Sequence, residues 1–72
     1  MEPTIAERAW IKRFERVLRD MPESMWLFAG GAGGLYAYRK VNEQHAMTDS
    51  GSVDQAFEIG SFGWVDADGG DW

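Results

Sequence analysis

The sequence predicts a small α+β domain in which one N-terminal amphipathic helix packs on a three-stranded antiparallel sheet, in the order α-β-β-β. Three observations predict it: helical apolar periodicity over residues 5–20, two apolar segments flanking a glycine run at 30–34, and a third alternating segment at 56–62. The 72 residues include no cysteine, so we expect one domain with a small core and no disulfide. We expect this domain to span residues 1–63 and residues 64–72 to form an acidic C-terminal tail.

The helix has a clear start and a clear end in the sequence. Thr4 and Glu7 have the spacing of a capping box, in which each side chain accepts a hydrogen bond from the other residue's backbone. The helix should therefore begin at Ile5 and continue to about Asp20. Pro22 ends it, because the residue before a proline is pushed out of the helical region.

The two sides of this helix differ in chemistry. At about 100° per residue, one side collects large apolar side chains, namely Trp10, Phe14, Val17, Leu18 and Met21. The opposite side collects four cations, namely Arg8, Lys12, Arg16 and Arg19. This pattern predicts a helix that buries its apolar side on the sheet and shows its basic side to solvent.

The rest of the chain is typical of a short antiparallel sheet. Residues 24–29 and 35–41 are apolar or alternating, and the glycines at 30–34 between them favour a hairpin turn. A polar loop follows at 42–54, and the third strand at 56–62 contains Gly60, which suggests a sheet edge or a bulge.

Charge is distributed very unevenly along the chain, which carries a net charge of −5. All seven basic residues lie within residues 1–40, whereas residues 41–72 hold seven acidic residues and no basic one. Such segregation concerns association rather than fold. It predicts a protein that binds a basic protein surface, and the candidate partner-binding residues are Glu58, Trp64, Asp66, Asp68, Asp71 and Trp72, with Tyr36 and Tyr38 as an aromatic patch.

Catalytic and metal-binding patterns are weak. His45 is the single histidine and lies in the polar loop, which is a poor place for a rigid triad. The glycine run at 30–34 is followed by a predicted strand and lacks the lysine and hydroxyl of a phosphate loop. The acidic run at 66–71 lacks the later glutamate of a calcium loop. We expect no catalytic residue, no cofactor and no metal site.

Membrane insertion and secretion are not indicated. The longest apolar stretch, residues 25–29, is far below the roughly 20 residues that span a bilayer. The first residues, with Glu2 and Pro3, do not resemble a secretory signal. These observations and the lack of cysteine predict a cytoplasmic protein.

The order of short motifs resembles a family. A proline-ended helix with Met21-Pro22-Glu23 is followed by Trp26-Leu27-Phe28, a glycine turn, Leu35-Tyr36, Arg39-Lys40 and finally Asp68-Gly69-Gly70-Asp71-Trp72. This series is similar to the small uncharacterised accessory proteins of tailed phages and prophages. The resemblance transfers no catalytic residue. It implies a protein that acts in the host cytoplasm by binding and redirecting one host protein, in some cases as an acidic DNA mimic.

The leading hypothesis is therefore a non-enzymatic phage or prophage accessory protein that binds a host protein, with its acidic half occupying a nucleic-acid-binding site. One alternative is a nucleic-acid-binding module that uses the basic helix side and the hairpin tyrosines, although the net charge of −5 disfavours it. Another is a structural or assembly protein that acts as an oligomer. The sequence leaves the oligomeric state open, and it also leaves open whether the acidic half contacts a partner or the chain's own basic helix.

Overall fold

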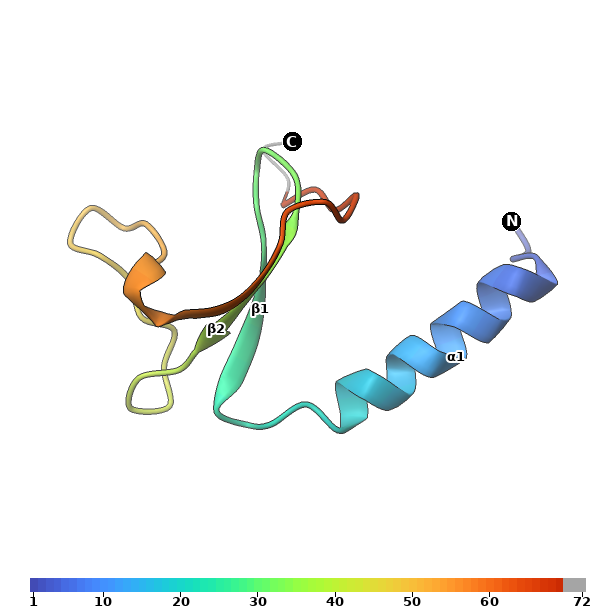
Figure 1. Ribbon diagram of the computed structural model, residues 1–72, viewed down its shortest axis with the longest axis horizontal. Coiled ribbons are helices and arrows are strands. Elements are labelled where there is room, and N and C mark those ends of the chain that lie inside the picture. The colour runs from blue at the N-terminus through green and yellow to red at the C-terminus, as the bar shows by residue number, and fades with distance from the viewer. Residues whose placement is uncertain (70–72) are drawn as a thin grey trace.

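The computed structural model describes residues 1–69 and contains one helix and three strands (Figure 1). Helix α1 spans Ile5–Arg19, and strands β1, β2 and β3 span Met25–Ala29, Leu35–Arg39 and Glu58–Phe62. A short 3-10 helix, η1, spans Gln55–Phe57 and leads into β3. The predicted α-β-β-β order and antiparallel sheet are confirmed.

Helix α1 begins where the sequence predicts, because the capping box forms. The backbone N–H of Thr4 donates to the Glu7 carboxylate at 2.7 Å, and the backbone N–H of Glu7 donates to the Thr4 hydroxyl at 3.1 Å. At the other end, the N–H groups of Asp20 and Met21 donate to carbonyls of the last turn, and Pro22 follows. The cap satisfies backbone donors that have no partner within the helix.

Strand β2 lies in the middle of the sheet and pairs antiparallel with β1 and with β3. Its pairing with β3 shifts between Ala37 and Tyr38, because Ala37 faces Gly60 whereas Tyr38 faces Glu58. One extra residue, Ile59, therefore lies in β3, and this is the bulge that Gly60 suggested.

The hairpin turn between β1 and β2 needs its glycines. Gly33 and Gly34 have φ values of +100° and +93°, a region that side chains disfavour. A side chain at Gly34 would also collide with the hydroxyl of Tyr36, whose ring lies over the turn. Gly69 packs closely on the same turn and donates its N–H to the Gly30 carbonyl at 2.9 Å. The described part of the tail therefore lies against the hairpin turn (Figure 1).

Within residues 1–69, the predicted packing of the helix on the sheet is not formed, and the third strand begins at Glu58 rather than at Ala56. No residue of α1 is buried, and Figure 1 shows the helix diverging from the sheet like the second arm of a V. The radius of gyration is 14.3 Å, compared with about 11 Å for a compact domain of this length. The reason lies in residues 20–24, a hydrogen-bonded corner that directs the helix away from the sheet.

Candidate protein-binding surface

The sheet has two different faces. Alternation along the strands places Trp26, Phe28, Tyr36 and Tyr38 on one side, which we call the aromatic face. The other side, which we call the open face, carries Met25, Leu27, Leu35, Ala37 and Phe62. Residues 41–57 cover part of the aromatic face, whereas the open face lines a cleft beside the helix.

The aromatic face is partly covered by residues 41–57 and holds Tyr38, which with Ala37 of the open face is one of the two buried apolar residues among those described. The rings of Trp26 and Tyr38 lie 5.4 Å apart, and those of Phe28 and Tyr38 lie 6.2 Å apart in an edge-to-face arrangement. His45 stacks on Trp26 with ring centroids 3.8 Å apart and planes within 3°. Such pairs stabilise a small core by about 0.5–1.5 kcal/mol each beyond area burial. His45 is exposed, as expected of a loop histidine, but it also covers the core.

Tyr38 is a core residue rather than part of an exposed patch, because its side chain is 4% exposed. Its hydroxyl makes a long hydrogen bond of 3.4 Å to the Glu58 carboxylate. Burial raises the pKa of Tyr38 above its usual value near 10, and the Glu58 charge and hydrogen bond raise this pKa further. The burial of Tyr38 could not be predicted from the sequence, because no local pattern indicates that residues 41–57 return to cover the aromatic face.

The remaining predicted partner-binding residues lie in different places. Tyr36 is half-buried over the hairpin turn, and Glu58 is exposed at the start of β3. Trp64 is 83% exposed, and Asp66 is exposed two residues later. Asp68 belongs to the segment on the hairpin turn and has an interaction partner, whereas Asp71 and Trp72 lie outside the described residues. The structure thus places Trp64 and Asp66 together at the surface and separates them from Tyr38.

The surface that sequence reasoning missed is the apolar side of the helix. Trp10, Ile11, Phe14, Val17 and Leu18 are all exposed, and we call this set the apolar stripe. Val17 is 65% exposed and Trp10 is 56% exposed, although both are of types that usually lie in a core. The Trp10 ring stacks on the Phe14 ring with centroids 5.1 Å apart, so these two side chains are in contact on the stripe.

The apolar stripe and the open face meet in a cleft of about 440 Å³ at the corner of the V. Phe14, Val17 and Leu18 line it from the helix, while Leu27 and Leu35 are among the residues that line it from the sheet. The helix wall is exposed and apolar, whereas the apolar sheet wall is mostly half-buried, with Phe62 exposed at its edge. An apolar surface that is open to solvent in this way marks a candidate interaction site.

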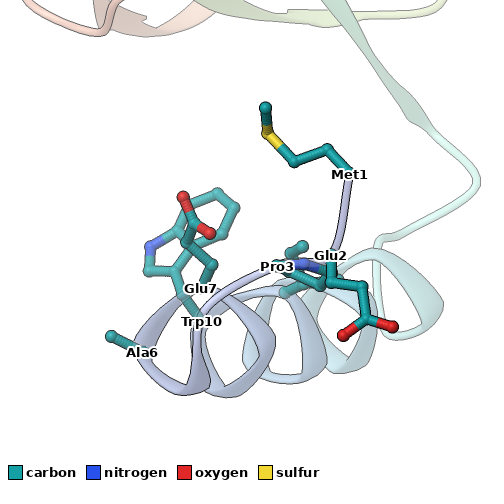
Figure 2. A pocket seen from close by; sticks show the side chains of 7 residues that line it. Met1, Glu2, Pro3, Ala6, Glu7 and Trp10 are labelled. Atoms are coloured by element: carbon teal, nitrogen blue, oxygen red, sulfur yellow. The ribbon is translucent and has the colours of Figure 1, made fainter.

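A second hollow, near the N-terminus, extends the apolar stripe rather than forming a separate site. Its lining includes Trp10 and Ile11 of the helix and Met1, which precedes the helix. Figure 2 shows the Glu7 and Trp10 side chains close together on the helix, with Met1 standing away from its surface. The Glu7 carboxylate is already engaged in the capping box, so it is not free for a ligand.

Within residues 1–69, no group of three or more histidine or carboxylate side chains lies close enough to hold a metal ion. No helix in this part of the chain is long and apolar enough to cross a membrane.

Comparison of the chain with protein-family models, with curated proteins and with solved structures gives no match.

Proposed function

We propose that this chain is a non-enzymatic protein-interaction module that binds another polypeptide through the apolar stripe of its helix. The observation that carries the proposal is the exposure of the stripe, because five large apolar side chains of one helix contact solvent in the isolated chain. Burying a side chain such as valine, leucine or phenylalanine stabilises a complex by about 1.5–3 kcal/mol relative to leaving it exposed.

The composition of the stripe supports a protein partner. Tryptophan is enriched among the residues that dominate binding free energies, and Trp10 lies beside Phe14 on the stripe. An amphipathic helix that presents its apolar side to a groove is also a recurrent mode of recognition between proteins. A non-enzymatic role agrees with the position of His45, whose ring is stacked on Trp26.

The test compares three forms of the chain. Immobilised wild-type chain is incubated with bacterial lysate and, separately, with a purified, tagged second copy, and retained proteins are identified by mass spectrometry. The proposal predicts that Val17→Glu loses the retained polypeptide, because the substitution places a charge within the stripe. Ile5→Glu is the matched control, since Ile5 is also exposed but lies on the opposite side of the helix. Equal retention by Val17→Glu and wild type would contradict the proposal.

A second mode of binding is favoured by Trp64 and Asp66. An exposed indole beside a carboxylate, in a half of the chain without basic residues, suits a partner with a basic surface. This mode corresponds to a phage or prophage accessory protein that binds a host protein. It predicts retention of a lysate protein that falls steeply with salt and is lost in Trp64→Ala with Asp66→Asn, whereas Asp49→Asn keeps it. Salt-independent retention would count against this second mode.

A further inference from the structure

The open cleft presents two complementary surfaces of the same chain. Its walls are lined by the C-terminal half of the apolar stripe and by the open face of the sheet. Trp10 and Ile11, in the N-terminal half of the stripe, do not line this cleft. The chain therefore has an apolar cleft and, beyond it on the same helix, two large exposed apolar side chains, Trp10 and Ile11.

We propose that the occupant of the cleft is a second copy of this chain. In the resulting two-fold dimer the two helices run antiparallel, and each places Trp10 and Ile11 in the cleft of the other copy. This inference rests on the proposed function and names its partner. A two-fold axis suits the geometry, because the same patch then serves as ligand and as receptor in both copies.

The exposed area is large enough for a stable dimer. The chain exposes 6124 Å², whereas a compact monomer of 8.1 kDa exposes about 4,500 Å². The excess is about 1,600 Å² per chain, so a dimer that covered all of it would bury about 3,200 Å² in total, within the range of obligate homodimers. Covering half of the excess would still give an interface of standard size.

Charge favours the contact of a helix with the sheet of another copy. Helix α1 holds five basic and two acidic residues, a formal charge of +3. The remainder of the chain holds two basic and ten acidic residues, a formal charge of −8. In the dimer each positive helix approaches the negatively charged remainder of the other copy. Most of its cations lie opposite the apolar stripe, so the attraction acts over a distance and speeds association rather than forming contacts in the cleft.

The helix itself needs a cover. An isolated helix of about 12–15 residues is marginal in water even with good caps, and α1 has 15 residues and no buried side chain. Its own sheet does not supply the cover, because hydrogen bonds fix the corner at residues 20–24. Met25 N–H donates to the Pro22 carbonyl at 3.2 Å, and Lys40 N–H donates to the Ser24 carbonyl at 2.8 Å. A second copy covers the helix without opening these bonds.

Sedimentation velocity over a concentration series tests the proposal on the full chain. Wild type and Ile5→Glu should sediment as a species of twice 8.1 kDa and dissociate on dilution. Trp10→Glu should remain a monomer at every concentration, since it places a charge in the partner's cleft. Far-ultraviolet circular dichroism should rise in helical signal with concentration for wild type and not for Trp10→Glu.

A disulfide experiment tests the geometry without relying on a disruptive variant, because the sequence lacks cysteine. Ile11→Cys and Leu27→Cys are made on two chains with different tags, mixed, and oxidised. The dimer predicts a mixed disulfide between the two tags, and the control pair of Ile5→Cys with Leu27→Cys should give far less of it.

The outcomes separate this inference from the proposed function. A monomer with the open dimensions of the structure would overturn the dimer and leave the helix stripe for another partner. A monomer with compact dimensions would overturn both, because the stripe would then be covered by its own sheet. A dimer that persists unchanged in Trp10→Glu and gives no mixed disulfide would overturn the proposed contact, in which each helix places Trp10 and Ile11 in the cleft of the other copy.

Discussion

The Val17→Glu substitution separates the open structure from a closed one by its effect on stability. Val17 is 65% exposed, and substitutions at such surface positions change the free energy of unfolding by about 0.5 kcal/mol or less. If the helix packed on its own sheet, the same substitution would lose about 1.5–3 kcal/mol of apolar burial and would also bury a charge. The expected loss of unfolding free energy in Val17→Glu is therefore several-fold larger for the closed arrangement than for the open one.

The assay is urea unfolding, followed by near-ultraviolet circular dichroism of the aromatic face, at several protein concentrations. In dilute solution the unfolding midpoints of wild type and Val17→Glu should coincide. As concentration rises, mass action should raise the midpoint of wild type but not that of Val17→Glu, because association stabilises the form that binds. Ile5→Glu should follow wild type throughout. A loss above about 1 kcal/mol in Val17→Glu that is the same at every concentration would refute the reasoning, because it would place Val17 in an intramolecular core.

Three further predictions concern the core and the cap. The raised pKa of Tyr38 means that the folded state favours the neutral phenol. The stability that this preference contributes is complete below pH 10 and is lost as pH rises through the folded-state pKa. Urea titrations at increasing pH should therefore show a smaller loss of unfolding free energy for Tyr38→Phe than for wild type, and equal losses would contradict the burial of this hydroxyl. His45→Ala should lower the free energy of unfolding by about 0.5–1.5 kcal/mol and change the near-ultraviolet spectrum of Trp26, and an unchanged spectrum would argue against the stack. Thr4→Ala should cost the helix about 1 kcal/mol and reduce the helical signal without moving the unfolding midpoint of the sheet, whereas a joint loss would mean that helix and sheet unfold together.

The elements of this fold could be predicted from local sequence patterns because each is encoded locally. The capping box at Thr4, the proline after the helix and the glycines of the hairpin act within a few residues, so their effects are visible in the sequence. The bulge beside Gly60 belongs to the same class. The structure bears out these local predictions.

The placement of the elements could not be predicted in the same way. Apolar periodicity shows that one side of the helix needs a cover, but it does not say whether the cover is the chain's own sheet. Two apolar or aromatic faces were available on the sheet, and the sequence gives no sign that residues 41–57 cover the one with Tyr38. For this reason the sequence predicts Tyr38 in an exposed patch, whereas Tyr38 is buried. It also predicts a buried apolar side of the helix, whereas that side is exposed.

Within the described residues, only part of the predicted acidic tail is free at the surface. Trp64 and Asp66 are exposed, whereas Gly69 is held on the hairpin turn by a backbone hydrogen bond to Gly30. Figure 1 shows this segment at the hairpin turn and apart from the helix. The described part of the tail therefore does not cover the basic side of the helix, and the alternative in which it did so is not what the structure has.

Small-angle X-ray scattering of the Trp10→Glu variant, extrapolated to zero concentration, shows whether the helix stays apart from its own sheet and leaves the apolar stripe exposed. The variant keeps the copies apart, so the radius of gyration reports a single chain. A helix that stays apart from its own sheet predicts a value of about 14.3 Å, or a larger one where the uncovered helix frays. A value near the roughly 11 Å of a compact domain of this length would contradict this arrangement.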